Sequence, residues 1–237
     1  YPVGEVEALS NGLASKLSSL GYNFGSNIAV HTGQHPDTAI AHMAICKIGG
    51  VAVTLSQLYG PETLKHALND CKVEVLITSN NAWNKLRQTK VTSFPYLKYV
   101  ILRDPDLGQN EISLTDAYLY ESNFKANFGI ANDPALLMYT SGSTGKPKGI
   151  LHGHRVLASY RPSINLFFNL SMKDKNAVYW SPSDWAWVGG LLDMLFPAWM
   201  AGKPIATSED RFNADWAYKF IERHKVTHTF LAPTAIK

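Results

Sequence analysis

The residues of this chain best suited to chemistry lie in one short segment, which reads Tyr-Thr-Ser-Gly-Ser-Thr-Gly-Lys-Pro-Lys-Gly from residue 139 to residue 149. Its glycines allow the backbone to turn N–H groups toward an anion, and its serine and threonine hydroxyls add neutral hydrogen-bond donors. Its two lysines supply compact positive charges that suit a phosphate. These residue types in this order therefore predict a phosphate-binding loop.

The surroundings of the loop decide between a phosphate site and a flexible linker. An apolar run at residues 135–139 predicts a buried strand before the loop, and a strand-like pattern resumes at residues 149–152. Flexible Gly/Ser linkers seldom lie between two such runs. The spacing also excludes a Walker-type P-loop, because Thr140 stands where the first glycine of that motif is needed and Pro147 follows Lys146. A phosphate loop of another kind is indicated.

Four stretches of the chain together resemble one known family. Residues 139–149 are similar to the signature phosphate loop of the adenylate-forming enzymes, which include acyl-CoA synthetases, luciferases and the adenylation domains of peptide synthetases. Residues 47–55, 181–190 and 228–236 also resemble segments of that family, in the same order and spacing. The last two stretches are similar to acetyl- and medium-chain acyl-CoA synthetases. The resemblance therefore favours the acyl-CoA branch.

The resemblance implies a two-step reaction that uses ATP, Mg²⁺ and coenzyme A. A carboxylate attacks the α-phosphate of ATP to give an acyl-adenylate, and coenzyme A then takes the acyl group. The residues implied to bind ATP are Thr140, Ser141, Gly142, Ser143, Thr144, Gly145 and Lys148. Lys148 and Thr144 would act in catalysis, with Thr144 also near the magnesium ion. Lys146 and Pro147 would shape the turn, and a purely solvated Lys148 remains the alternative.

The acyl side of the site is implied by two further segments. Trp187, Val188 and Gly189 resemble residues that line the acyl pocket, and Pro233 and Thr234 lie where the family places a turn near the pantetheine tunnel. Acetyl-specific members usually carry threonine where this chain has Gly189. Since a missing side chain leaves room, we expect an acyl group larger than acetate.

Three other polar residues near these segments allow a functional or a structural role. Asp184 beside the tryptophans has no obvious carboxylate partner for acid–base work, which favours a structural role. His152 and His154 would lie on one face of a strand. No further ligands stand at a spacing suited to a metal site.

Composition places the chain among ordinary globular proteins. Its 237 residues are 46% hydrophobic and 17% charged, and the net charge of +3 is too small to indicate nucleic-acid binding. The two cysteines, Cys46 and Cys71, favour a reducing, cytoplasmic compartment, and no apolar stretch is long enough to span a bilayer. Organellar targeting and oligomeric state are not indicated by the sequence.

Alternating apolar strands and amphipathic helices predict an α/β fold, with parallel β-sheets covered by helices on both faces. The expected helices are 6–20, 37–48, 61–69, 82–88, 156–168, 188–200 and 215–224. The expected strands are 27–32, 51–55, 73–78, 99–102, 135–139, 149–152, 177–180, 204–206 and 228–231. Residues 103–134 are polar, and their apolar residues show little periodicity, which predicts a surface connection. We expect a first subdomain at 1–132, incomplete at its start, and the phosphate loop with part of a second subdomain at 133–237.

Measured against the family, the chain is expected to be an N-terminal fragment. An adenine-binding segment with a threonine–glutamate pair, a ribose-binding aspartate and a C-terminal domain with a catalytic lysine are not found in it. The fragment alone is therefore expected to be nearly inactive. The leading interpretation is an acyl-CoA synthetase for a short- or medium-chain carboxylic acid. An aryl-acid or other carboxylate ligase, and a non-catalytic nucleotide- or acyl-binding module, are the alternatives.

Overall fold

The chain forms two compact units. The computed structural model describes residues 1–89, 94–103, 108, 110–121, 123–127, 129–140 and 145–235, without the side chain of residue 163. The first unit comprises Tyr1–Thr32 and Pro36–His154, and the second comprises Gly33–His35 and Arg155–Lys237. The sequence-based division falls at residue 132 instead, before the strands that flank the phosphate loop.

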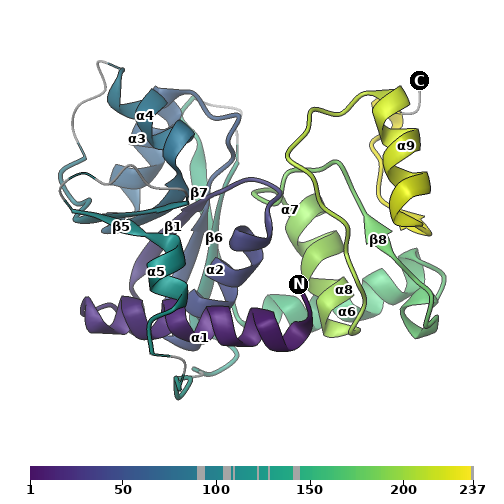
Figure 1. The fold of residues 1–237 in the computed structure, drawn as a ribbon, viewed down its shortest axis with the longest axis horizontal. Helices are drawn as coiled ribbons and strands as arrows, with labels where there is room; N and C mark the ends of the chain where they lie inside the picture. Colours follow the sequence, from purple (N-terminus) through teal and green to yellow (C-terminus); the bar gives the residue numbers. More distant parts are fainter. Residues whose placement is uncertain are drawn as a thin grey trace. The chain divides into compact units, whose positions relative to one another are not determined.

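A seven-stranded sheet forms the centre of the first unit, with the strand order β5-β4-β3-β1-β2-β6-β7 (Figure 1). The strands are β1 (Asn27–His31), β2 (Val51–Thr54), β3 (Val75–Ser79), β4 (Tyr99–Arg103), β5 (Glu111–Ser113), β6 (Pro134–Thr140) and β7 (Lys148–Gly153). Every neighbouring pair is parallel except β6 and β7. The central strands β2 and β3 are buried except at Ser79, which explains their mostly apolar sequences.

Helices cover both faces of this sheet. They are α1 (Val3–Ser19), α2 (Pro36–Lys47), α3 (Pro61–Asp70), α4 (Asn80–Arg87) and α5 (Leu114–Tyr118). The connections β1–α2–β2 and β2–α3–β3 run in opposite directions along the sheet, so right-handed crossovers place α2 and α3 on opposite faces. Helix α1 packs against α2 and α5, and the side chains of Leu64 and Leu68 of α3 and Leu86 of α4 belong to one buried cluster. The predicted α/β fold is confirmed.

Two parts of the first unit differ from the sequence-based expectation. The segment expected to be a plain surface connection contains β5 and α5, and β5 forms an edge of the sheet. With a single apolar residue, Ile112, β5 is too short to give a periodic signal. The last strand, β7, is antiparallel to β6, so the segment predicted to bind phosphate joins the two strands of a hairpin.

The second unit is smaller and mostly helical. Its helices include α6 (Arg155–Phe167), α7 (Val188–Gly190), α8 (Phe196–Met200) and α9 (Ala214–His224), with a single-turn 3₁₀ helix η3 at Pro233–Ala235. A wide π-type turn at Leu191–Leu195 connects α7 to α8, so the predicted helix 188–200 is helical but not regular. Pro197 explains this wide turn. Proline has no backbone N–H to donate, and its ring would clash with the carbonyl group four residues earlier in a regular α-helix.

The strands of the second unit are shorter than expected. Strands β8 (Tyr179–Trp180) and β9 (His228–Thr229) are parallel, and α9 lies between them in the chain. The expected strand 204–206 is reduced to one bridge between Ile205 and Tyr179. The apolar side chains of Trp180, Ala217 and Phe220 form the buried contact between β8 and α9.

Candidate functional site

The two strands that flank the phosphate loop place Thr140 and Lys148 directly opposite each other. In the β6–β7 hairpin, Thr140 pairs with Lys148 and Tyr139 pairs with Gly149. Directly opposed residues in an antiparallel pair have Cβ atoms about 5 Å apart and point to the same face. The hydroxyl and the ammonium group predicted to bind ATP thus belong to the last residue pair of the hairpin before the connecting loop. Lys148 is exposed and therefore accessible to a ligand.

The glycines of the hairpin have different structural roles. Gly145 has φ +127°, a conformation that favours glycine, and no atom of the described residues lies within 4 Å of the position of a Cβ. A Cβ at Gly149 would lie 3.0 Å from Leu137 Cδ2 and 3.3 Å from Tyr139 Cζ, so Gly149 lets the tyrosine ring pack closely. The predicted ligands Ser141, Gly142, Ser143 and Thr144 lie outside the described residues. The roles of these residues, including that of Thr144 toward magnesium, stay predictions.

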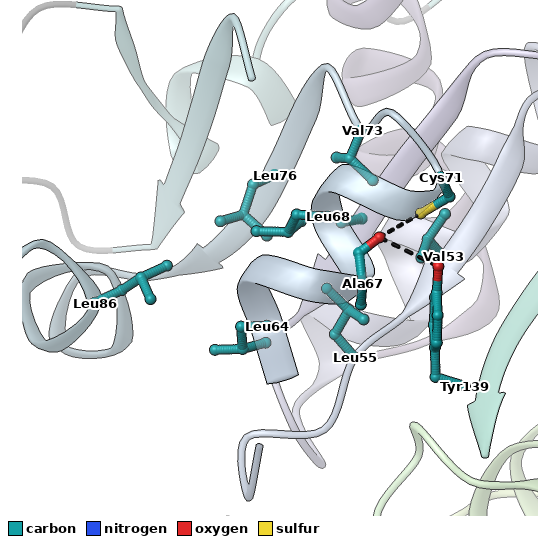
Figure 2. Close-up of a cluster of buried hydrophobic side chains, with 11 residues drawn as sticks. Val53, Leu55, Leu64, Ala67, Leu68, Cys71, Val73, Leu76, Leu86 and Tyr139 are labelled. Atoms are coloured by element: carbon teal, nitrogen blue, oxygen red, sulfur yellow. Dashed lines mark hydrogen bonds between the residues drawn. The ribbon is translucent and has the colours of Figure 1, made fainter. Parts of the chain in front are cut away.

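Tyr139 anchors the hairpin to the helix-covered core. Its ring is 1% exposed, and its hydroxyl donates to Asp70 Oδ2 at 2.7 Å, with the carbonyl oxygen of Ala67 at 3.2 Å. Figure 2 shows Tyr139 beside α3, where the Cys71 thiol also donates to the Ala67 carbonyl at 2.9 Å. Burial, aided by the hydrogen bond to Asp70, raises the pKa of Tyr139 well above its usual range.

Two more side chains fix the backbone at both ends of the loop. Tyr59 donates its hydroxyl to the carbonyl oxygen of Tyr139 at 3.2 Å, just before the loop. His66 Nε2 donates to the carbonyl oxygen of Pro147 at 2.9 Å, just after it. The His66 ring also meets Tyr139 edge-on, with centroids 6.2 Å apart. Residues from the β2–β3 connection therefore hold the hairpin at the point where the loop begins and ends.

Replacing Tyr139 by phenylalanine is expected to lower the free energy of unfolding by about 1 kcal/mol, because one hydrogen bond to a carboxylate is lost while the ring remains. Asp70 is exposed, so water replaces the lost donor and limits the cost. Urea unfolding measures the change. Tyr218→Phe is the matched control, because Tyr218 is 72% exposed, and this variant should retain the stability of the unaltered chain. An unchanged midpoint for Tyr139→Phe would contradict the anchoring role.

The tryptophan-rich segment of the second unit is held by a tight turn. The carboxylate of Asp184 accepts the N–H of Ala186 at 3.0 Å, and the Asp184 carbonyl accepts the N–H of Trp187 at 3.0 Å. A Cβ at Gly190 would lie 2.5 Å from the carbonyl oxygens of Ser183 and Asp184, so glycine is needed at the last residue of α7. Asp184 therefore has the structural role that the sequence favours.

Gln34, a residue that the sequence did not single out, connects this turn to the rest of the second unit. Its side-chain amide donates to the carbonyl oxygen of Ser181 at 2.9 Å and also to that of Ser183. Its own carbonyl accepts the hydroxyl of Thr207. Because Gln34 is 9% exposed, these bonds are shielded from water and fix the backbone that leads to Trp187.

The predicted acyl-side residues have different environments. Trp187 is half-buried and Val188 is 39% exposed, whereas Trp180 and Trp185 are buried in the core. Pro233 and Thr234 form an exposed single turn, η3. The premise that Gly189 leaves open space is wrong, because a Cβ there would lie 2.8 Å from Cε1 of Phe230. The preference for an acid larger than acetate stays a prediction, without support from that premise.

The predicted site is thus divided between the two units. The first unit contains Thr140, Gly145 and Lys148, and the second contains Trp187, Val188, Gly189, Pro233 and Thr234. Within the described ranges, no three His, Cys, Asp or Glu side chains are grouped to hold a metal ion. In the same part of the chain, no helix is long and apolar enough to cross a membrane.

Sequence reasoning missed the side chains that bind the backbone on either side of the loop and the ring that contacts Gly189. Tyr59, His66 and Asp70 are separated from the loop by about 70–80 residues, and no motif in the sequence connects them to it. Phe230 follows Gly189 by 41 residues and stands in a segment selected only for the later Pro233 and Thr234. Their roles come from tertiary contacts, which a single sequence does not reveal.

Comparisons with known proteins identify the family of the chain. A family model described as AMP-binding enzyme matches residues 3–237. Acetyl-coenzyme A synthetases from Bacillus subtilis (strain 168) and Drosophila melanogaster are each 27% identical, covering 100% and 94% of this chain. The matched regions are only 41% and 38% of those relatives, so the chain spans about two fifths of their length.

The fold is similar to that of a solved acyl-CoA synthetase. The crystal structure of Brucella canis acyl-CoA synthetase superimposes with a TM-score of 0.85 at 20% identity. The alignment covers 97% of this chain and 41% of that one. At this identity the similarity supports the fold.

Proposed function

Because the chain belongs to the family of AMP-binding enzymes, we propose that it is the ATP- and acid-binding portion of an acid–thiol ligase. The ligase activates a short- or medium-chain carboxylic acid with ATP and transfers the acyl group to coenzyme A. Relatives named acetyl-coenzyme A synthetase support this reaction class. Since the chain spans about two fifths of their length, the activity belongs to the complete protein that contains these residues.

The observation that carries the proposal is the opposition of Thr140 and Lys148 across the hairpin. A positive charge and a hydroxyl donor aimed from one face suit the phosphate oxygens of ATP, because adenylyl transfer depends mainly on positioning and charge neutralisation. Tyr59, His66 and Asp70 hold the backbone on both sides of the loop. These bonds fix Tyr139 and Pro147, the residues on either side of the proposed nucleotide-binding loop.

The proposed chemistry has two steps. A carboxylate oxygen of the acid attacks the α-phosphorus of ATP, the bond to pyrophosphate breaks, and an acyl-adenylate forms. The thiolate of coenzyme A then attacks the acyl carbon and AMP leaves. Lys148 is assigned to the β- and γ-phosphates that leave as pyrophosphate, and Thr144 is assigned to Mg²⁺ on the resemblance alone.

Pyrophosphate exchange tests this function in the complete protein. Labelled pyrophosphate is incubated with ATP, Mg²⁺ and single acids: acetate, butyrate, hexanoate, octanoate and benzoate. We expect label in ATP that depends on an aliphatic acid. Exchange with benzoate alone would replace the aliphatic-acid proposal by an aryl-acid ligase. Binding of ATP without exchange for any acid would contradict the ligase proposal and favour a nucleotide-binding module.

A further inference from the structure

The contact between Gly189 and Phe230 carries an inference that rests on the proposed function and deepens it. We propose that Phe230 is a specificity-determining residue that limits the length of the acyl group. Its ring fills the space that glycine at position 189 opens. The substrates of the unaltered protein are accordingly short straight-chain carboxylic acids, and a smaller side chain at position 230 admits longer ones.

The geometry makes Gly189 and Phe230 one packing unit. The position of a Cβ on Gly189 lies 2.8 Å from Cε1, 3.6 Å from Cδ1 and 3.7 Å from Cζ of the Phe230 ring. A carbon–carbon contact below 3 Å is too short for packed atoms, whose best separation is about 3.5–4.0 Å. A side chain at position 189 and the ring in this place therefore exclude each other. The Phe230 ring can occupy this position because residue 189 has no side chain.

The Phe230 ring is held in place from its other sides. Its backbone N–H donates to the carbonyl oxygen of Trp180 at 3.4 Å, and its carbonyl accepts the hydroxyl of Ser181 at 2.7 Å. The ring lies 6.0 Å from that of Phe167, centroid to centroid. It also packs against a buried cluster of the second unit formed by Ile164, Phe168, Ala177, Tyr179, Met194 and Ala198. A ring with these supports does not swing away freely to admit a long chain.

The connection to the acyl group comes from the position of Gly189. Residues 187–189 resemble the segment that lines the acyl pocket in acyl-CoA synthetases, and Val188 beside the glycine is 39% exposed. An aromatic ring that covers position 189 shortens a pocket at this place. Discrimination per methylene in such pockets is about 10- to 200-fold. Removing the ring should therefore change the preferred chain length measurably.

The test compares Phe230→Ala with the unaltered complete protein by pyrophosphate exchange with acetate, butyrate, hexanoate and octanoate. We expect the unaltered protein to prefer the short acids. Phe230→Ala should raise the ratio of kcat/KM for hexanoate over that for butyrate by at least about 10-fold. The double variant Gly189→Ala/Phe230→Ala should restore part of the preference for the shorter acid, because the alanine methyl group at position 189 occupies part of the space that the ring left.

Controls separate a specificity role from a structural one. Phe212→Ala removes a partly exposed ring of the same unit, outside the cluster around Phe230, and should keep the original ratio. Phe230→Leu serves if the alanine variant does not fold, with a smaller shift in the same direction. An unchanged ratio in a folded, active Phe230 variant would overturn the inference while leaving the proposed function intact. No exchange in the unaltered protein with any acid would refute the proposed function, and this inference with it.

Discussion

Replacing Lys148 by methionine in the complete protein is expected to lower the rate of pyrophosphate exchange by about 10²–10³-fold, the usual cost of removing one preorganised electrostatic group. Methionine keeps the length and apolar stem of the side chain while it removes the charge. Lys148 is exposed and lies across from Thr140, so the substitution removes the proposed interaction with the nucleotide. The free energy of unfolding should therefore stay close to that of the unaltered protein.

The chain supplies a matched control two residues away. Lys146 is also an exposed lysine, but it precedes β7, and no described residue pairs with it in the hairpin register. Lys146→Met removes the same charge from the same loop and should keep the exchange rate within a few-fold. Equal losses from both variants would show that only the summed positive charge of the loop matters. That result would contradict a specific role for Lys148.

The chain is expected to lose stability in mild acid because His31 and His42 are buried. The two residues are 6% and 4% exposed. Burial lowers the pKa of each imidazole from 6.5 to about 4. His31 Nδ1 lies 3.0 Å from Thr78 Oγ1, and His42 Nδ1 lies 2.7 Å from the carbonyl oxygen of Thr38. Both rings are thus packed and hydrogen-bonded in the neutral form.

The direction of the effect follows from proton binding. Below pH 6.5 the unfolded chain binds protons at these two imidazoles while the folded chain does not, so the unfolded state gains stability. The free energy of unfolding should fall by up to about 1.4 kcal/mol per pH unit for each histidine between pH 6.5 and 4. Each residue lowers the free energy of unfolding by an amount on the order of 3 kcal/mol at pH 4. Above pH 6.5 this stability is fully present.

Urea unfolding from pH 8 to pH 4 measures this loss. His31→Asn and His42→Gln should each flatten the pH dependence, and unfolding at pH 8 gives the cost of each substitution itself. NMR titration of the ring protons gives an independent value that does not need the variants. Ring resonances of either histidine that titrate near pH 6.5 in the folded protein would contradict the account.

The sequence predicted the elements whose buried residues form a regular apolar pattern. Apolar runs such as residues 51–55 and 73–78 predict strands because both faces of the central sheet are covered. The sequence failed where order depends on distant partners. Strand β5 consists of Glu111, Ile112 and Ser113 and exists because β4 supplies its hydrogen bonds. The residues of β7 likewise do not show that this strand runs antiparallel to β6.

The candidate site divides in the same way. The loop at residues 139–149 is recognisable because glycines, hydroxyls and lysines in that order have few other uses. Its anchors Tyr59 and His66 carry no such signal, since ordinary surface helices and turns contain the same residue types. Gly189 shows the limit most clearly. A glycine suggests empty space when only the sequence is read, but Phe230 from a distant segment fills it.

The most direct test of the central claim follows one oxygen atom through the reaction. The complete protein is incubated with ATP, Mg²⁺, coenzyme A and butyrate labelled with ¹⁸O in both carboxylate oxygens, and the AMP formed is examined by mass spectrometry. If the carboxylate attacks the α-phosphorus, each AMP carries one ¹⁸O atom in its phosphate. Unlabelled AMP, or ADP with labelled inorganic phosphate, would contradict the acyl-adenylate account.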